Sequence, residues 1–333
     1  MPASRVTIAQ VATEAGVSSM TVSNVVNGRP GASEATRARV LAVAERLGYP
    51  ANLSARNRRT GKIGVVSLDL ISEYSHEIIR GIAEDLMDDE RELLINVSVD
   101  AARERERIEF FARELVDGIL LVAPQLEPDT VEYVRGLRVP VVVVDPRHLD
   151  VPLPRVTVDN YGGMRAGTEH LLALGHRRIA FIRGDEELDS TEARRHGYLD
   201  AMRLAGIDVG DEMTADSGVS HAGGQRAATE LIDRVRPTAI IAGADLIALG
   251  AIDAARALGL DVPRDLSIVG FDDIPRAAQT YPALTTVRQP LRDMGLAGAR
   301  ALASLIEGRP LAVDHIHLPT SLVVRGTTAP APR

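Results

Sequence analysis

From residue 63 onward the sequence alternates between two kinds of segment, and this alternation constrains the fold more than any other feature. Short runs rich in β-branched residues have the length and composition of buried strands. Longer amphipathic stretches with helical spacing separate them. One series of strands and helices is followed by a second of similar length, which predicts an α/β fold with two doubly wound parallel-sheet subdomains. The expected strands are 63–68, 93–97, 118–123, 139–144, 178–182, 212–215, 238–242 and 266–271.

The amphipathic stretches complete the two predicted subdomains. Ligands of doubly wound folds bind beyond the carboxyl ends of the strands. Two such subdomains facing each other therefore place the expected ligand site in the cleft between them. Residues 327–333 continue neither pattern and are expected to be disordered. The expected helices are 75–90, 104–116, 129–137, 161–174, 191–205, 222–235 and 245–258.

The first 60 residues contain no strand pattern and instead predict three short helices. Thr7, Ser18 and Ser33 can each cap a helix through a side-chain oxygen, and the helices are expected to end near residues 15, 26 and 47. Between the first two, Gly16 supplies the positive φ of a tight turn, and Val17 can fill the angle between the helices. This spacing is typical of a helix-turn-helix, whose second helix enters the major groove of DNA.

Charge is distributed unevenly along the chain. Residues 1–62 carry nine basic and three acidic side chains, a formal charge of +6. The remaining 271 residues carry 29 basic and 43 acidic side chains, a formal charge of −14. A small basic segment attached to a large acidic body indicates a module that binds a polyanion. Chance clustering of arginines on a solvated face is the alternative interpretation.

Length and composition exclude several classes of protein. The 333 residues suffice for two or three domains. The absence of cysteine rules out disulfides, thiolate catalysis and zinc sites with sulfur ligands. No apolar run reaches the roughly 18 residues that a membrane span requires, and residues 1–10 lack the apolar region of a signal peptide. We therefore expect a cytoplasmic protein without a membrane partner.

No catalytic or metal site is predicted. His315 and His317 share one face of an expected strand, but no third ligand accompanies them, which favours histidines on an edge strand over a metal site. His76 precedes Glu77 but lacks the second histidine of a helical zinc motif. The sequence contains neither a G-x-S-x-G elbow nor a Walker loop. We expect no catalytic residue, no metal and no cofactor.

Seven short motifs run in register along nearly the whole chain. They are VTIAQVA at 6–12, AGVS at 15–18, TVSNVVNG at 21–28, DGILLV at 117–122, LGHRRIAFI at 174–182, VGFDDIP at 269–275 and LTTVRQP at 284–290. Together they resemble the LacI/GalR family of bacterial transcription regulators. The resemblance implies a helix-turn-helix DNA-binding domain over 1–50, a hinge over 51–61 and a periplasmic-binding-protein-like effector-binding and dimerisation domain over 62–328. The first subdomain would comprise 62–158 and 291–318, and the second 159–290 and 319–328.

The same resemblance implies which residues contact DNA. Ser19, Met20 and Asn24, at the start of the second helix, would read bases. Many family members have arginine at the position of Asn24. Because asparagine prefers adenine and arginine prefers guanine, we expect the operator to differ there. The side chains that would contact phosphates, with helix capping as the structural alternative, are Thr7, Ser18, Thr21, Ser23 and Asn27.

The expected hinge departs from the family pattern at one position. Ala55 and Arg56 keep the pattern and favour a hinge helix. Arg58 stands where family members commonly place a leucine that wedges into the central minor-groove step and kinks the duplex. An arginine can instead lie in a narrowed minor groove or bind phosphate, and a solvated linker residue is the alternative.

For the effector, the resemblance implies contacts at the strand ends that face the cleft. Two positions depart from the family pattern, because Ala244 replaces a common asparagine and Gly218 lies near a position where sugar-binding members carry an aromatic residue. A carbohydrate is the favoured effector, and a purine or nucleoside is the alternative. Each expected contact has a helix cap or a surface ion pair as its structural alternative. The expected contacts are Tyr74, Asp145, Arg194, Asp272 and Gln289.

These features predict an allosteric, operator-binding transcription regulator that acts as a repressor, and not an enzyme. It would bind a near-palindromic operator as a homodimer whose affinity a small effector controls. No heptad repeat follows the sensor, so we expect a dimer rather than a tetramer. One competing interpretation is a solute-binding protein for uptake, which the missing signal peptide and the basic first segment disfavour. The other is a cytosolic enzyme acting on sugars or nucleotides, for which no catalytic setting is recognisable.

Overall fold

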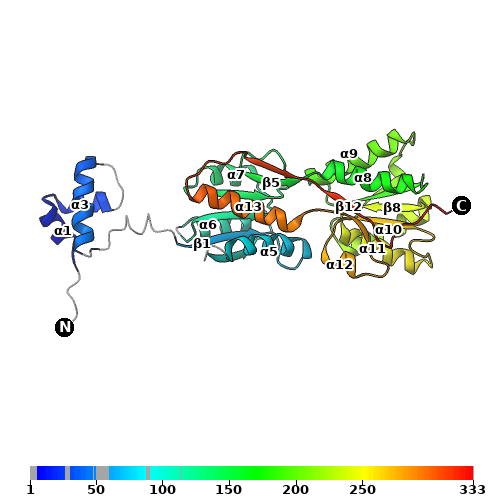
Figure 1. Ribbon diagram of the computed structural model, residues 1–333, viewed down its shortest axis with the longest axis horizontal. Helices are drawn as coiled ribbons and strands as arrows, with labels where there is room; N and C mark the ends of the chain where they lie inside the picture. The colour runs from blue at the N-terminus through cyan, green and yellow to red at the C-terminus, as the bar shows by residue number, and fades with distance from the viewer. Residues whose placement is uncertain are drawn as a thin grey trace. The chain divides into compact units, whose positions relative to one another are not determined.

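The computed structural model describes residues 6–26, 31–47, 49, 60–87, 91–113 and 115–332. The chain forms two compact units, Met1–Thr60 and Gly61–Arg333 (Figure 1). The predicted phosphate contact of Asn27 lies outside the described residues, as do the predicted hinge contacts of Ala55, Arg56 and Arg58.

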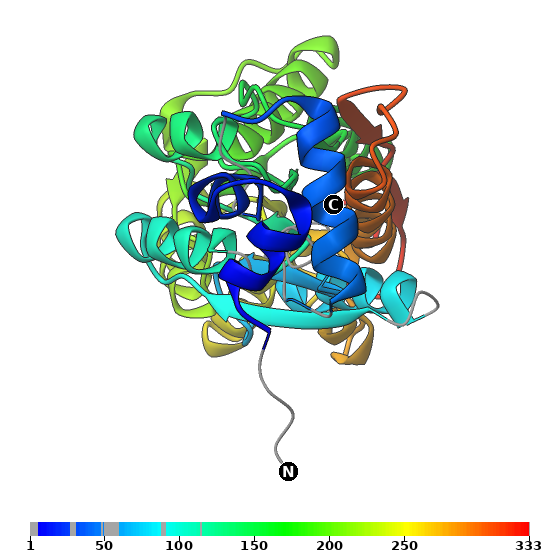
Figure 2. The same ribbon diagram turned by 90° about the vertical axis from the view of Figure 1, so that its left-hand side faces the viewer.

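The described part of the N-terminal unit contains three helices around one small core (Figure 2). They are α1 (Ile8–Ala15), α2 (Ser19–Val26) and α3 (Glu34–Arg46). Each begins where the sequence predicts, because the capping oxygens of Thr7, Ser18 and Ser33 accept a backbone N–H from the first turn. The core consists of Val11, Ala12, Ala15, Val22, Val25, Val26, Val40, Val43 and Ala44.

The turn between α1 and α2 confirms the predicted helix-turn-helix geometry. Gly16 has a φ of 66° and lies in the left-handed region, where a side chain would be strained. Val17 follows it and packs partly buried against the core of the unit. Glycine and valine at these two positions therefore set the angle at which α2 leaves α1.

The first lobe of the C-terminal unit is built on a parallel sheet of strand order β11-β5-β4-β3-β1-β2. Successive residues face opposite sides of it. Leu120 in β3 packs with α5 and α13, whereas Leu121 packs with α6 and α7. The strands are β1 (Lys62–Ser67), β2 (Glu92–Val97), β3 (Gly118–Val122), β4 (Val141–Val144), β5 (Arg155–Val158) and β11 (His315–Leu318). The helices are α5 (Glu73–Met87), α6 (Ala101–Ala112), α7 (Pro128–Arg135) and α13 (Leu291–Ile306).

The second lobe has the same construction, with strand order β12-β10-β9-β8-β6-β7, and only β12 runs antiparallel to its neighbour. Ile240 in β8 packs with α10 and α11, and Ile241 packs with α8 and α9. The strands are β6 (Ile179–Arg183), β7 (Thr214–Asp216), β8 (Ala239–Ala242), β9 (Ser267–Asp272), β10 (Thr285–Arg288) and β12 (Ser321–Val323). The helices are α8 (Asn160–Ala173), α9 (Asp189–Leu204), α10 (His221–Val235), α11 (Asp245–Ala257) and the short α12 (Pro275–Gln279).

The chain crosses between the lobes at residue 159, at residues 289–290 and at residues 319–320 (Figure 1). As a result, α13 and β11 return to the first lobe, and β12 completes the second. These two doubly wound lobes confirm the predicted fold class. The sequence pattern did not predict α13, β5 or β10, and it placed a strand at 212–215, where a short 3₁₀ helix, η1 (Asp211–Met213), leads into β7.

The prediction that residues 327–333 are disordered is wrong for residues 327–332. Thr327 is fully buried, and its hydroxyl donates a 2.6 Å hydrogen bond to the carbonyl of Ile268. The Ala331 N–H donates to the carbonyl of Leu174 at 2.9 Å. This segment carries no apolar periodicity, since backbone and hydroxyl hydrogen bonds hold it on the second lobe, and such bonds leave no pattern in a sequence.

The helices of the two lobes are of ordinary length for a globular fold. In the described ranges the longest are α9 and α13, with 16 residues each. None of the described helices is both long enough and apolar enough to pass through a bilayer.

Candidate functional site

Helix α2 presents one solvent-facing side that carries the predicted base-reading residues. The opposite side of the helix carries three buried valines, Val22, Val25 and Val26. Met20 is 71% exposed, and Asn24, one turn later, is half-buried. Residues four apart lie on the same side of a helix, so Met20 and Asn24 are neighbours there. Ser19 is exposed at the first position of the helix.

The hydroxyl groups predicted to contact phosphates also cap helices in the N-terminal unit. The Thr7 N–H donates to Gln10 Oε1 at 2.7 Å, which completes a reciprocal capping box. Ser18 Oγ accepts the N–H of Thr21 at 3.0 Å and lies 2.9 Å from the hydroxyl of the same residue. Ser23 is half-buried in α2. The capping alternative therefore applies to Thr7 and Ser18, and it leaves both near helix N-termini, where anions are favoured.

A cavity of about 570 Å³ lies between the two lobes of the C-terminal unit. Its lining comes from residues at or just beyond the carboxyl ends of β1, β3 and β4 in the first lobe and of β6, β7, β8 and β9 in the second. Small-molecule sites usually measure about 300–1,000 Å³. The cavity has the size of a ligand site and occupies the cleft where the sequence predicts one.

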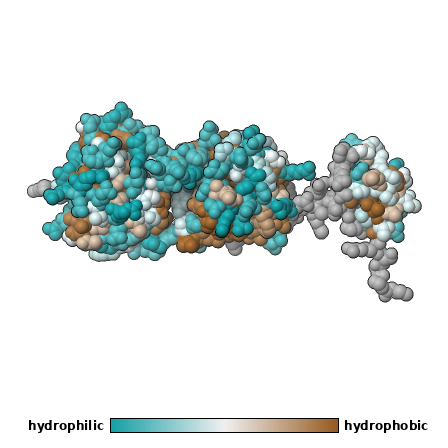
Figure 3. All heavy atoms as spheres, turned by 180° about the vertical axis from the view of Figure 1, so that it is seen from behind, coloured by the Kyte–Doolittle hydropathy of each residue, from teal (hydrophilic) through white to brown (hydrophobic). Residues whose placement is uncertain are grey.

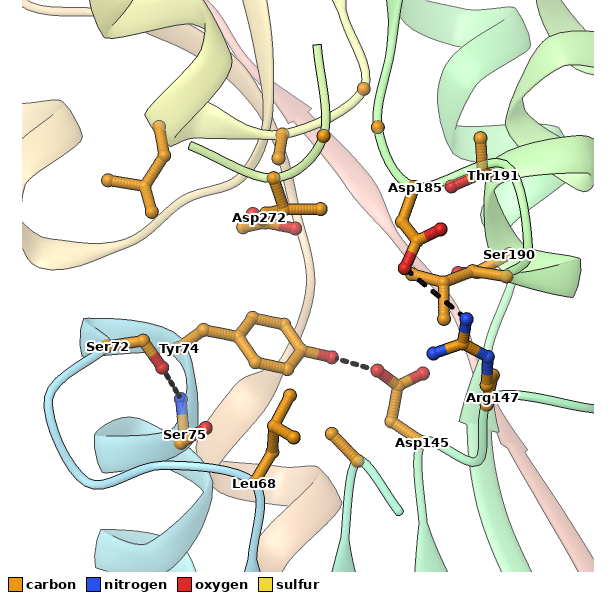
Figure 4. A pocket seen from close by; sticks show the side chains of 18 of the residues that line it. Leu68, Ser72, Tyr74, Ser75, Asp145, Arg147, Asp185, Ser190, Thr191 and Asp272 are labelled. Atoms are coloured by element: carbon orange, nitrogen blue, oxygen red, sulfur yellow. Dashed lines mark hydrogen bonds and ion pairs between the residues drawn. The ribbon is translucent and has the colours of Figure 1, made fainter. Parts of the chain in front are cut away.

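Tyr74 and Asp145 are two of the residues with which the first lobe lines the cavity (Figure 4). Tyr74 lies in the first turn of α5, and its hydroxyl donates a 2.6 Å hydrogen bond to Asp145 Oδ2. Asp145 follows β4 with a φ of 53°, a left-handed conformation that turns its side chain toward Tyr74. Burial raises the pKa of the Asp145 carboxyl. Burial and the nearby carboxylates raise the pKa of Tyr74 well above its ordinary value, so the phenol remains a hydrogen-bond donor.

Arg194 is the arginine that the second lobe contributes to the cavity lining. It extends from α9, where its Nε donates to Asn160 Oδ1 at 2.8 Å and its Nη1 donates to the carbonyl of Gly243 at 2.5 Å. The guanidinium carbon lies 3.8 Å from the centre of the Phe271 ring, a cation–π contact. Nη1 is also 3.8 Å from Asp272 Oδ1. These contacts hold the guanidinium plane in one orientation against the cavity.

Asp272 ends β9 and contributes a carboxylate to the same wall. Its φ of 124° is a left-handed conformation that non-glycine residues rarely adopt. Burial raises its pKa from 3.8 to about 6, against the opposing effect of Arg194 and of the hydrogen bond from Gln289. Gln289 does not line the cavity. It lies behind Asp272 and donates from Nε2 to Oδ1 at 2.7 Å, so it orients the carboxylate from the far side.

Two contacts between the lobes at the edges of the cavity were not predicted. Arg147, after β4, pairs with Glu187. Its Nη2 also lies 3.6 Å from Asp185 Oδ2 (Figure 4). At another edge, Glu73 Oε2 accepts the Arg276 N–H at 2.8 Å, and its Oε1 is 3.1 Å from Arg276 Nε. The partners are 40 residues apart in the first contact and 203 in the second, so no local pattern signals them.

The positions that depart from the family pattern also lie at the cavity. Ala244 and Gly218 both line it. Tyr74 is the only aromatic residue among the described lining residues. Tyr281 is 91% exposed and is not part of the lining. Any aromatic surface that the described lining offers to a ligand therefore comes from Tyr74.

The two histidines considered for a metal site lie on an edge strand, as predicted. His315 and His317 belong to β11, the outermost strand of its sheet. Thr157 Oγ1 is 2.6 Å from His315 Nε2 and 3.0 Å from His317 Nδ1. Among the described residues, no group of histidine, aspartate and glutamate side chains is arranged to hold a metal ion.

The fold and the site together define a class of protein. A helix-turn-helix unit joined to a two-lobed α/β unit with an inter-lobe cavity is the architecture of a ligand-responsive DNA-binding regulator. Two family models match the chain accordingly. Residues 7–52 match the bacterial regulatory proteins of the lacI family, and residues 168–328 match the periplasmic binding protein-like domain.

Full-length similarity identifies the family. The chain is 37% identical to the HTH-type transcriptional regulator MalR of Streptomyces coelicolor over 336 residues, which cover 98% of this chain and 97% of that protein. The chain belongs to the LacI family of bacterial transcription regulators, as its motifs predict. It is a DNA-binding transcription regulator, and because this family consists of regulators, the prediction that it is not an enzyme is confirmed.

Solved structures confirm the fold over the same length. The transcriptional regulator CelR–cellobiose complex has a TM-score of 0.75 and 32% identity, covering 97% of this chain and 100% of that one. The lac repressor dimer bound to operator and the anti-inducer ONPF has a TM-score of 0.73 and 28% identity, covering 97% of this chain and 99% of that one. Both units of the chain therefore have counterparts in each structure.

Proposed function

We propose that the chain is a transcriptional repressor whose affinity for a near-palindromic operator is controlled by a small effector in the cleft. One observation carries the proposal: the two lobes supply complementary polar groups to one cavity. Tyr74 and Asp145 come from the first lobe, and Arg194 and Asp272 come from the second. A ligand that bonds to both pairs favours one arrangement of the lobes through its differential affinity. Such a shift is the means by which effector binding and DNA binding become coupled.

A carbohydrate is the proposed effector, and a purine or nucleoside is the alternative. The similar CelR structure holds cellobiose, which supports a sugar in the corresponding cleft. Carboxylates accept hydrogen bonds from hydroxyl groups, and a guanidinium donates to them. Tyr74, Asp145, Arg194 and Asp272 supply both kinds of group at the base of the cavity. The proposed role of Gln289 is to orient Asp272 rather than to touch the effector.

On the DNA side, Ser19, Met20 and Asn24 are proposed to read bases in the major groove. The exposed side of α2 supports this role. A cytoplasmic location is part of the proposal, because the operator DNA of a bacterium lies there. The proposed phosphate contacts are Thr7, Ser18, Thr21, Ser23 and Asn27, and the proposed minor-groove contacts of the hinge are Ala55, Arg56 and Arg58.

We propose a homodimer that pairs the first lobes along the open edge of their sheet. Strand β2 ends the sheet, and large apolar side chains are exposed around it. Figure 3 shows hydrophobic side chains gathered along the lower border of the lobe in the middle of that view. Exposed apolar groups on a sheet edge favour association between chains. The exposed side chains are Leu70, Ile71, Ile95, Val99 and Phe110.

A gel-shift experiment tests the proposed function. The full chain is titrated against DNA from the upstream region of its own gene, with and without panels of sugars, purines and nucleosides. A repressor with a sugar effector gives a retarded complex whose affinity a sugar changes, and light scattering gives the mass of a dimer. A solute-binding protein would bind a ligand and leave the DNA unshifted. A stable tetramer at micromolar concentration would contradict the proposed assembly.

A further inference from the structure

The cleft carries more acidic than basic side chains. Seven carboxylates and two guanidinium groups, those of Arg147 and Arg194, line it. A phosphorylated or carboxylated effector would need one of these two guanidinium groups as its counter-charge. Two of the seven carboxylates already pair with arginines outside the lining, Glu73 with Arg276 and Asp216 with Arg183.

Arg194 already makes hydrogen bonds and an ionic contact within the protein. Its Nε and Nη1 donate to Asn160 and Gly243, and its charge faces Asp272 at 3.8 Å. The side chains of Arg194 and Asp272 are both 11% exposed, so their attraction is screened little by water. An anionic ligand at Arg194 would therefore also lie beside a buried carboxylate, which repels it.

Arg147 is neutralised in a different way, by carboxylates of the opposite lobe. Its guanidinium pairs with Glu187 and lies 3.6 Å from Asp185, the second of which is drawn in Figure 4. Both acidic residues lie in the loop between β6 and α9. The backbone strengthens this contact, because the Asp189 N–H donates to the Arg147 carbonyl at 3.1 Å. A ligand anion at Nη2 of Arg147 would have to displace these two carboxylates, and an anion at the rest of the guanidinium would lie close to both of them.

The groups that remain suit hydroxyl donors. Asp145 and Asp272 accept hydrogen bonds from uncharged partners, Tyr74 and Gln289. A carboxylate has about four lone-pair positions, so each retains acceptor capacity for a ligand. In the lining that the structure describes, both guanidinium groups have acidic neighbours, so an oxyanion bound at either one would lie beside a carboxylate.

We propose that the cleft selects an uncharged, hydroxyl-rich effector, and that Asp185 and Glu187 exclude phosphorylated sugars by pairing with Arg147. The proposal rests on the proposed function, since it assumes that the cleft binds the effector. It assigns the carboxylates at this edge a role in specificity. Removing the two acidic charges should convert the edge into an anion site without altering its shape.

The double variant Asp185→Asn/Glu187→Gln tests the masking in the full chain. Both substitutions are nearly isosteric, and the two side chains are 39% and 72% exposed, so folding is retained. Isothermal titration with inorganic phosphate should show at least a tenfold gain in affinity over the wild type. The matched control is Glu169→Gln/Asp200→Asn, which removes the same charge from surface pairs with Arg165 and Arg203. It should show no comparable gain.

Two further measurements separate the outcomes. Adding Arg147→Gln to the double variant should abolish the gain, and a gain that persists would remove Arg147 from the proposal. In the wild type, glucose 6-phosphate should stabilise the chain against heat no more than glucose does. Preferential stabilisation by the phosphate ester, or an unchanged phosphate affinity in the double variant, would overturn the inference. Neither assay uses DNA, so a failure of operator binding would count against the proposed function alone.

Discussion

Gln289 donates a 2.7 Å hydrogen bond to Asp272 from behind the wall of the cleft. The two residues are 3% and 8% exposed. Gln289 lies in the segment that carries the chain from β10 in the second lobe to α13 in the first. The hydrogen bond therefore links the carboxylate at the cavity to a crossing between the lobes, the part of the unit that must adjust if the lobes move.

Replacing Gln289 with leucine should weaken effector binding and destabilise the C-terminal unit. The substitution removes the donor and leaves Asp272 Oδ1 buried without it, a loss of about 1–3 kcal/mol. Urea unfolding and calorimetric titration with the effector measure the two effects. The control is Gln279→Leu, the same change at an exposed position at the end of α12. Equal behaviour of the two variants would show that the hydrogen bond does not orient the carboxylate.

Asp272 should make stability depend on pH in a defined direction. Burial raises its pKa from 3.8 to about 6, so the folded state binds the proton more tightly than the unfolded state. The stability associated with this group is greatest at low pH and is lost as the pH rises from about 4 through about 6. Thermal melting of the wild type and of Asp272→Asn across this range measures the difference, which should narrow as the pH falls. Parallel melting profiles would contradict the raised pKa.

Gly295 should be among the least replaceable residues of the first lobe. It lies where α13 crosses α5, and an added Cβ would come 2.0 Å from the carbonyl oxygen of Ile78. Gly295→Ala should therefore lower the free energy of unfolding by about 1–3 kcal/mol or more through overpacking. Gly136→Ala is the control, because its φ is −83° and its nearest added contact would be 3.4 Å. Urea denaturation should leave the control within about 1 kcal/mol of the wild type.

Most strands and helices of the two lobes were predictable from sequence, because burial leaves a pattern of apolar residues. Strands such as β3 are buried on both faces and read as continuous apolar runs. The helix-turn-helix was predictable because Thr7, Gly16 and Ser18 act locally, each through its own cap or turn. The segment from Thr327 onward was not, because its hydrogen bonds reach residues far away in the sequence, such as Ile268 and Leu174.

The residues of the site also differ in whether the nearby sequence could indicate their role. Tyr74, Asp145, Arg194 and Asp272 lie near strand ends or on the helices that follow, so a family motif could indicate them, and all four line one cavity. The salt bridge of Arg147 joins loops of opposite lobes. Which loops meet depends on how the two sheets face each other across the crossings, and that relation is a property of the tertiary structure alone.

The affinity for DNA should fall steeply as the salt concentration rises, and the basic side chains of residues 1–62 should account for this fall. Residues 1–62 carry a charge of +6. A dimer contacting about 6–10 phosphates gives a log–log slope of roughly −5 to −9. Arg58→Ala should flatten the slope by about one unit per subunit. Binding at several salt concentrations measures it, with Arg264→Ala, an exposed arginine of the second lobe, as the control. A slope that Arg58→Ala leaves unchanged would make Arg58 a solvated linker residue.

Asn24 should determine the preferred base at one position of each half-site. It shares the exposed side of α2 with Met20, and its amide matches the acceptor and donor pair of adenine in the major groove. Asn24→Arg should shift the preference from adenine to guanine, because a guanidinium bonds both acceptors of guanine, and each such contact contributes about 1–3 kcal/mol. Selection from randomised half-sites with the wild type and the variant measures the shift. The variant should keep the base preferences at the operator positions that Ser19 and Met20 are proposed to read. A changed base preference at every operator position would instead indicate that α2 has moved in the groove. An unchanged preference would show that Asn24 does not reach the base edges.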